Sequence, residues 1–154
     1  MAYPIGTPGA AKEAVVEKYK QLFNRLLPEG WQLTDETNKV SWDEKLDMGR
    51  YTLKDVKNNV IASFELYPMI NCCGICVSTK AMVAFAWQHK GIGTLLNSFR
   101  VDLARHLGYG LLLCTDVETN EYQRKVLAKN GWKDLYKFVN PRTRNSVFIS
   151  AINL

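Results

Sequence analysis

The sequence predicts a mixed α/β (α+β) protein in which helices flank a central, mostly antiparallel sheet. Apolar residues recur at helical spacing in some segments and at every second position in others. Turns rich in glycine or asparagine separate these segments. With 154 residues, 47% of them hydrophobic, and no linker-like or repeated stretch, the chain has the size and composition of one domain over residues 1–154.

The first predicted helix begins at Pro8, with Thr7 as its cap, and ends before Pro28. Its apolar residues fall at helical spacing, so one face of this helix is expected to meet the core. A short strand is predicted at Trp31–Leu33. The following stretch, Thr34–Asp47, is rich in acidic residues and has no clear periodicity.

The middle of the chain has the pattern of strands. Tyr51–Val56 and Val60–Tyr67 alternate around an asparagine-containing turn, which predicts a β-hairpin. Gly74–Ala86 follows as a longer strand. Its continuous apolar end, Ala81–Ala86, predicts a central strand that is buried on both faces.

The last part of the chain is predicted to alternate between helices and strands, with glycines at the helix ends. In chain order, these elements are a helix from Gly91 to Gly108, a buried strand Gly110–Cys114, a helix Asn120–Asn130 ending at Gly131, and paired strands Trp132–Val139 and Ser146–Ile152 around the turn at Asn140–Thr143.

The chain is moderately basic, with 20 Lys and Arg against 15 Asp and Glu, a net charge of +5 and a pI near 9.0. This excess favours anionic ligands. Cations gather in Arg124–Arg144, whereas Thr34–Asp47 is acidic. We therefore expect one positive and one negative region. A nucleic acid bound along the basic stretch is an alternative to two solvated faces.

Neither a membrane span nor a secretory signal is predicted, because the apolar runs are short and the first residues lack the signal pattern. We therefore expect a cytoplasmic, reducing environment in which the cysteines stay free. Cys73 and Cys76 have the spacing of zinc ligands, and either is also a candidate acyl-accepting nucleophile. The second Cys-x-x-Cys pair is absent, and Cys114 lies in an apolar run, which favours a small core residue and no metal.

The segment Gln88-His89-Lys90-Gly91-Ile92-Gly93-Thr94 joins the central strand to its helix. Its glycines allow the backbone to approach a ligand, and the N–H groups at a helix N-terminus bind anions such as phosphate. The segment matches neither the dinucleotide fingerprint nor the nucleoside triphosphate loop.

This segment resembles the pyrophosphate loop of the GNAT superfamily of acyl-CoA-dependent N-acyltransferases, which reads Gln/Arg-x-x-Gly-x-Gly/Ala. Gln88, Gly91 and Gly93 match that pattern, and the resemblance extends over residues 78–139 through Asn120 and Gly131-Trp132. It implies a single-domain GNAT-like fold with acetyl-CoA as cosubstrate.

The resemblance also implies a set of binding residues. Backbone N–H groups of the loop would hold the CoA pyrophosphate, the strand before it would run beside the pantetheine arm, and an asparagine would bond that arm. The residues that match are Met82, Val83, Ala84, Gln88, His89, Lys90, Gly91, Ile92, Gly93, Thr94 and Asn120.

Two positions depart from the family pattern. Many members carry a tyrosine seven residues after the asparagine, where it protonates the leaving thiolate, but here that position is Leu127. The small residue usual three positions after the asparagine is Gln123. Tyr122 is near in sequence, but helical geometry turns it about 140° away from position 127. The general acid is therefore unassigned.

Glu65, on the polar face of its strand, is the first choice for the general base that takes the proton of the amine. The alternatives are Asp116, Glu118, His89 and His106. We expect His89 to help hold phosphate and His106 to cap the end of its helix or to face solvent.

The expected function is N-acetyl transfer from acetyl-CoA to a primary amine of a small molecule, a polyamine, or a protein lysine or N-terminus. By resemblance, the acidic stretch covers the acceptor, which favours a cationic amine, and Trp42 is the aromatic residue we assign to acceptor contact. Two alternatives stay open, a nucleic-acid-directed acyltransferase that modifies a nucleobase amine and a non-catalytic interaction protein with this fold. Both a monomer and a homodimer are compatible with the sequence.

Overall fold

The computed structural model describes residues 8–35, 38–39, 47–69 and 71–154. In chain order, the elements are α1 (Pro8–Phe23), β1 (Gln32–Asp35), β2 (Asn38–Lys39), β3 (Asp47–Lys54), β4 (Val60–Pro68), β5 (Ile75–Val83), a 3-10 turn η1 (Phe85–Trp87), α2 (Ile92–His106), β6 (Leu111–Val117), α3 (Glu121–Lys129), β7 (Lys133–Val139) and β8 (Ser146–Asn153).

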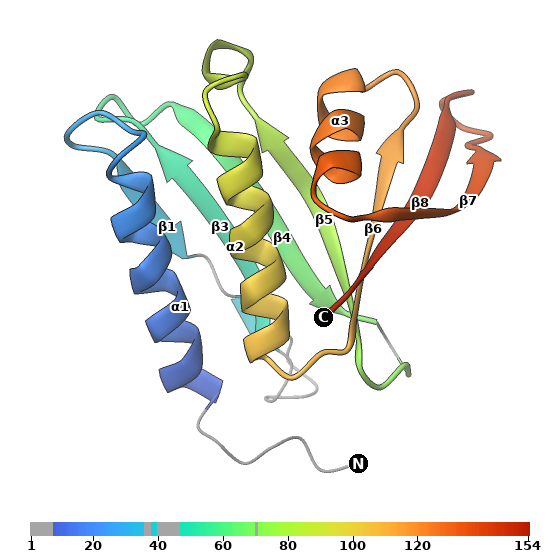
Figure 1. The fold of residues 1–154 in the computed structure, drawn as a ribbon, viewed down its shortest axis with the longest axis horizontal. Coiled ribbons are helices and arrows are strands. Elements are labelled where there is room, and N and C mark those ends of the chain that lie inside the picture. Colours follow the sequence, from blue (N-terminus) through green and yellow to red (C-terminus); the bar gives the residue numbers. More distant parts are fainter. Residues whose placement is uncertain (1–7, 36–37, 40–46, 70) are drawn as a thin grey trace.

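The strands form a sheet in the order β1-β3-β4-β5-β6-β8-β7, and β2 pairs with β3 beside this path. The pairing of β5 with β6 is parallel, whereas the other neighbours in the order are antiparallel. Helices α1, α2 and α3 lie on the same face of the sheet (Figure 1). The predicted fold class, a mixed and mostly antiparallel sheet flanked by helices, is confirmed.

An aromatic cluster forms the core between the helices and β3 and β4. Phe99 of α2 stacks on Tyr19 of α1 with ring centroids 4.9 Å apart. It also meets Tyr51 at 5.3 Å and Phe64 at 5.1 Å, both in edge-to-face geometry. Phe64 and Phe99 are fully buried. These contacts fix α2 on the sheet. Helix α2 begins within the segment Gln88–Thr94, which we call the glycine loop.

Helix α1 ends at Phe23, which is earlier than predicted. The next residues form turns, and the Asn24 side chain accepts a hydrogen bond of 2.7 Å from the Trp31 indole. Pro28 disfavours helical geometry at the residue before it, which shortens the helix. Leu27 is still 93% buried, so the apolar spacing correctly indicated a core contact although the element ends sooner. The predicted cap Thr7 lies outside the described residues.

The prediction that Ala81–Ala86 is buried on both faces is wrong. Strand β5 ends at Val83, and the exposed fractions of Met82 and Phe85 are 44% and 90%. The reason is that β6 pairs only with the first half of β5, so the second half has a neighbouring strand on one side alone. Met82 therefore lacks flanking side chains on the β6 side, and Phe85 lies beyond the strand in η1.

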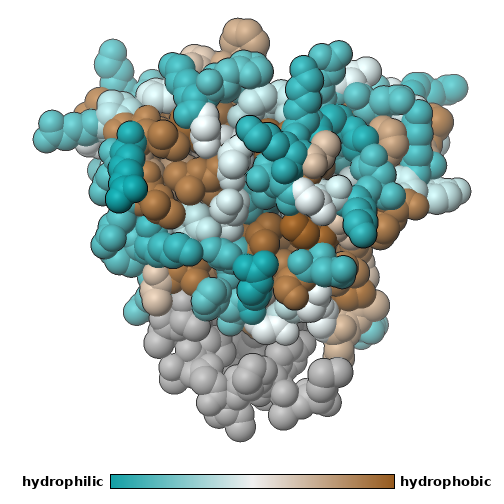
Figure 2. Space-filling view, in the orientation of Figure 1, coloured by the Kyte–Doolittle hydropathy of each residue, from teal (hydrophilic) through white to brown (hydrophobic). Residues whose placement is uncertain are grey.

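The helix-bearing face is mostly hydrophilic, with hydrophobic residues showing between polar ones (Figure 2). Within the part of the chain that the structure describes, no helix is long and apolar enough to cross a membrane.

Replacing Phe99 by alanine is expected to lower the free energy of unfolding by about 3 to 5 kcal/mol, because it opens a cavity at the centre of the aromatic cluster. Urea denaturation followed by circular dichroism measures this change. Phe85→Ala is the matched control, because Phe85 is 90% exposed. The control is expected to change stability by less than about 0.5 kcal/mol. Equal losses in the two variants would contradict this account of the core.

Candidate active site

Strands β5 and β6 separate in the middle of the sheet. Their parallel pairing runs only from Ile75 and Leu111 to Ser78 and Cys114. Beyond that point, β5 continues beside β4 and β6 continues beside β8. The two strands diverge toward their C-terminal ends, and α3 lies in front of the space between them (Figure 1). We call the point after Ser78 and Cys114 the splay point.

A β-bulge lies on β5 directly after the splay point. Glu65 of β4 pairs with Thr79, and Ser63 pairs with Met82, so β5 has one residue more than β4 in this interval. Lys80, within the bulge, has a left-handed backbone with φ of 52°. A bulge interrupts the ladder and leaves the extra residue unpaired. Backbone groups at the start of the diverging half of β5 are therefore released from the regular ladder.

The glycine loop follows β5 and leads into α2. The Gln88 side chain donates a 3.1 Å hydrogen bond to the carbonyl of Val83, which ties the loop to the end of β5. His89 and Gly91 have positive φ values of 61° and 85°, and Gly91 is the N-cap of α2. The first N–H groups of a helix have no partner within the helix and favour an anion. The predicted anion-binding segment thus lies at a helix N-terminus.

Two loop side chains pack on aromatic rings. The Lys90 ammonium lies 5.0 Å from the centroid of the Trp87 ring. The ring of His89 meets that of Tyr122 at 5.4 Å in edge-to-face geometry. Both His89 and Lys90 are exposed, so their polar ends are accessible beside the loop.

Tyr122 of α3 reaches the start of α2. Its phenol oxygen accepts a hydrogen bond from the Gly93 N–H, and burial raises its pKa. A Cβ at Gly93 would lie 2.2 Å from that oxygen, so glycine is needed there for the close approach. Leu127, where the family pattern has tyrosine, is 2% exposed and belongs to the core. Sequence spacing correctly separated Tyr122 from position 127 but gave no signal that it faces the loop.

Asn120 is the N-cap of α3. Its side-chain oxygen accepts a 3.2 Å hydrogen bond from the backbone N–H of Gln123. The residue is exposed, and its amide NH₂ group is a donor directed away from this cap bond. Capping explains the asparagine structurally, while its contact with a pantetheine arm stays a prediction.

Consecutive residues of β5 at the splay point face opposite sides of the sheet. Ser78 faces the helices, because its hydroxyl accepts a 3.1 Å hydrogen bond from Arg100 of α2. Thr79 faces the other side, where its hydroxyl lies 3.4 Å from the Glu65 carboxylate. Glu65 therefore lies across the sheet from α2 and the glycine loop.

Glu65 is 4% exposed and is surrounded by donors. Arg50 donates a 2.7 Å hydrogen bond to its carboxylate, Lys80 lies 3.6 Å away, and the Tyr67 hydroxyl also bonds it. Burial alone raises the pKa of this carboxyl, but the hydrogen bonds from Tyr67 and Arg50 outweigh burial and hold the pKa below its usual value. Glu65 is thus ionised at neutral pH.

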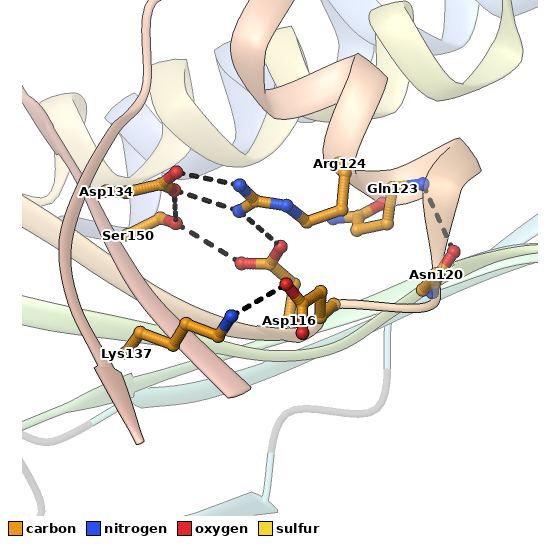
Figure 3. A network of polar contacts seen from close by, with 8 residues as sticks. Asp116, Asn120, Gln123, Arg124, Asp134, Lys137 and Ser150 are labelled. Carbon is orange, nitrogen blue, oxygen red and sulfur yellow. Dashed lines mark hydrogen bonds and ion pairs between the residues drawn. The ribbon is translucent and has the colours of Figure 1, made fainter. Parts of the chain in front are cut away.

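The alternative bases Asp116 and Glu118 are bound to cations of the basic stretch, and Figure 3 shows Asp116 beside Arg124. Asp116 accepts a 2.8 Å bond from Arg124, which also holds Asp134 at 2.7 Å. Glu118 pairs with Lys137 at 2.7 Å. Arg124 and Lys137 therefore have carboxylate partners, and they contribute less to a surface for polyanions than the sequence suggests.

The other candidates do not join the site. Burial raises the pKa of the Cys76 and Cys114 thiols to about 12, so neither is a thiolate at neutral pH. Cys73 is exposed, and the described residues contain no group of three or more His, Cys, Asp or Glu able to hold a metal. His106 bonds the Asp102 carbonyl at 2.8 Å near the end of α2. Trp42 lies outside the described residues.

The solved structures that resemble this chain include several acetyltransferases of the GNAT family. One from Elizabethkingia anophelis, with acetyl-CoA bound, is 15% identical with a TM-score of 0.64, over 82% of this chain and 100% of that chain. A GCN5-related N-acetyltransferase from Kribbella flavida is 18% identical with a TM-score of 0.61, over 83% and 100% of the two chains.

Spermidine N-acetyltransferase from Vibrio cholerae, in complex with CoA and spermine, is 15% identical with a TM-score of 0.56, over 89% of this chain and 74% of that chain. No protein-family model and no curated protein sequence matches the chain. At these low identities the likeness concerns the fold.

The contact between Gly93 and Tyr122 leads to a stability prediction. Gly93→Ala is expected to lower the free energy of unfolding by about 1 to 3 kcal/mol, because its Cβ overlaps the phenol oxygen. Combining it with Tyr122→Phe removes the overlapping atom and should recover about 1 kcal/mol of that loss in a double-mutant cycle. Urea denaturation of the four proteins measures the coupling. Additive effects would show that Tyr122 does not limit the residue at position 93.

Proposed function

We propose that this chain, whose fold is that of the GNAT acetyltransferases, is an N-acetyltransferase that moves the acetyl group of acetyl-CoA to a primary amine. The observation that carries the proposal is the glycine loop at the N-terminus of α2, which follows the diverging half of β5 after the short turn η1. An anion site and an interrupted ladder thus adjoin in one segment, as required to hold a phosphate at one end of a ligand and a reacting carbonyl at the other.

In this proposal, the backbone N–H groups from His89 to Thr94 hold the CoA pyrophosphate, and the Gly93 N–H exchanges its bond to the Tyr122 oxygen for one to a phosphate. The positive φ values of His89 and Gly91 shape the loop, and Lys90 adds positive charge beside it. Gln88 keeps the loop attached to β5. The residues fit a phosphate because they offer N–H donors and cations.

The diverging half of β5 is the proposed track for the pantetheine arm, along Met82, Val83 and Ala84. Met82 is 44% exposed although it is apolar, which is consistent with a surface that a ligand covers. Backbone groups at the bulge would orient the thioester carbonyl. Asn120, with its amide NH₂ directed away from the cap, would bond the arm from α3.

Positioning supplies most of the rate in the proposed reaction. The neutral amine nitrogen attacks the thioester carbonyl carbon, the C–N bond forms, and the C–S bond breaks with its electron pair on sulfur. The amide nitrogen loses one proton. Holding amine and thioester in line provides about 7 to 11 kcal/mol of the barrier reduction. A buried leucine at position 127 means that this helix position provides no proton donor for the thiolate.

Glu65 is the proposed acceptor of the amine proton. Glu65 is ionised and lies on the face of the sheet opposite to the glycine loop. An amine that approaches on that face would meet a thioester whose CoA is bound at the loop on the other face. The lowered pKa of Glu65 makes it a weak base that passes the proton on to water. Arg50 and Lys80 beside it keep the carboxylate in place.

The acceptor class is proposed as a primary amine of a small molecule, a polyamine, or a protein lysine or N-terminus. Support for a cationic acceptor comes from the acidic stretch, most of which lies outside the described residues. The spermidine N-acetyltransferase of similar fold was crystallised with spermine. An amine library with CoA release as the readout would identify the acceptor.

Acetyl-CoA binding measured by calorimetry tests the proposed site. Gly91→Trp is expected to weaken binding by at least about tenfold, because the indole would fill the loop. Gly74→Trp is the matched control, because Gly74 has a similar φ of 80° and an open surrounding but precedes β5 at the end away from the loop. The control is expected to retain wild-type affinity. An absence of binding to the wild-type protein would overturn the proposed function.

The role of Glu65 is tested by kinetics with an accepted amine. Glu65→Gln is expected to lower kcat by about a hundredfold with little change in KM for acetyl-CoA, because the proton acceptor is lost. Asp55→Asn, which alters a hydrogen-bonded carboxylate in the β3–β4 turn, is expected to leave kcat unchanged.

The pH profile gives a second readout. A base must be deprotonated to act, and the pKa of Glu65 is lowered from 4.5, so the acid limb assigned to it is expected below pH 4.5. An unchanged kcat in Glu65→Gln would assign the proton acceptor to another group.

A further inference from the structure

Arg100 of α2 carries a buried charge at the splay point. It is 2% exposed and is the largest fully buried side chain in the described residues. Its guanidinium donates to the Ser78 hydroxyl at 3.1 Å and to the Asn97 side-chain oxygen at 3.3 and 3.2 Å. The ring of Trp132 lies 4.7 Å from the guanidinium carbon, and the indole N–H also donates to Asn97 at 2.9 Å. All of these partners are neutral.

Among the described residues, no carboxylate contacts this guanidinium. Burial lowers the Arg100 pKa, and Asp116 of β6 raises it through space to a smaller extent. Asp116 is itself bound to Arg124 at 2.8 Å and to Ser150 at 3.2 Å (Figure 3). Arginine keeps its proton in proteins, so Arg100 remains a cation.

A buried charge of this kind is costly. Desolvating a cation without a directly paired anion is strongly unfavourable, and an apolar side chain of similar length is often better tolerated at such a position. Neutral side chains also suffice to join Ser78, Asn97 and Trp132 by hydrogen bonds and packing. These contacts therefore do not require a full positive charge, and the charge itself is the feature that a function would explain.

The location of the charge suggests that function. Ser78 and Cys114 form the last pair before β5 and β6 diverge. On the helix-bearing face, the Arg100 guanidinium donates a hydrogen bond to the Ser78 hydroxyl. The glycine loop opens the same helix. A ligand anchored by its phosphates at the loop, with its thioester between the diverging strands, would have its sulfur on the side of the sheet that holds Arg100. Glu65 lies on the opposite side.

We propose that the buried charge of Arg100 stabilises the CoA thiolate as it leaves, in place of a proton donor. This inference rests on the proposed function. When the C–S bond breaks, its electron pair stays on sulfur and the product is the thiolate anion, with the amine proton released to Glu65 and then to water. In an interior of low dielectric constant, a fixed cation lowers the energy of a nearby anion without contact. Arg100 thus acts on the sulfur through its electric field and does not contact it.

The test measures the ionisation of the CoA thiol bound to the protein, followed by thiolate absorbance in the ultraviolet as pH is raised. In the wild-type complex, the thiol pKa is expected about one unit or more below that of free CoA. Arg100→Met, an apolar residue of similar length, should abolish this shift. Arg100→Gln serves the same purpose if the methionine variant does not fold. Arg100→Lys keeps the charge and should keep most of the shift.

Trp132→Phe is the control for a structural effect. It removes the indole N–H bond to Asn97 at 2.9 Å while Arg100 and its charge remain. A loss of the thiol shift in Arg100→Met but not in Trp132→Phe supports the proposal. Because His89 and Lys90 are unchanged in every variant, their charges cannot account for such a difference.

Two outcomes overturn the inference and leave the proposed function standing. In the first, CoA binds but its thiol titrates as in free solution. In the second, the shift persists in the neutral Arg100 variants, which would assign it to the loop. A failure of wild-type protein to bind CoA would overturn the inference together with the proposed function.

Discussion

The hydrogen bonds between β5 and β6 stop after Ser78 and Cys114, and the rest of the candidate site depends on this limit. Each strand keeps one antiparallel neighbour beyond that point, β4 for β5 and β8 for β6, so both remain extended while they separate. The bulge at Lys80 lies immediately beyond it and changes the direction of β5. Two separate halves of the sheet therefore meet at one short parallel pairing.

Different interactions attach the helices to the two halves of the sheet. On the side of β3 and β4, the aromatic cluster around Phe99 fixes α2 by apolar packing. On the side of β6 and β8, an ion-pair network around Arg124 ties α3 to Asp116 and Asp134 (Figure 3). The group of Arg100, Asn97 and Trp132 lies between them and joins α2 to the segment after α3. Separate supports of this kind allow the strands to diverge without loss of the sheet.

The charges at the splay point are ordered across the sheet. Ser78 and Thr79 are adjacent in β5. Ser78 accepts a hydrogen bond from Arg100 on the helix-bearing face, whereas Thr79 donates one to Glu65 on the other face. Beside these adjacent residues of one strand lie a buried cation, Arg100, and a buried carboxylate, Glu65. Arg50 and Lys80 pair with Glu65 on its own side of the sheet and hold it as an ionised carboxylate.

Apart from the short strand β2, which no pattern indicated, the sequence by itself determined the order of helices and strands, the glycine loop at the start of α2 and the fold class, because periodicity and glycine positions are local properties of the chain. The sequence prediction was wrong at Ala81–Ala86, where apolar residues indicated burial but β6 no longer pairs with β5. Only the tertiary structure placed Tyr122 at Gly93, paired Glu65 with Arg50, and set Arg100 beside Ser78. These contacts join residues that are distant in sequence, and no local pattern records which side chains meet when the sheet and helices pack.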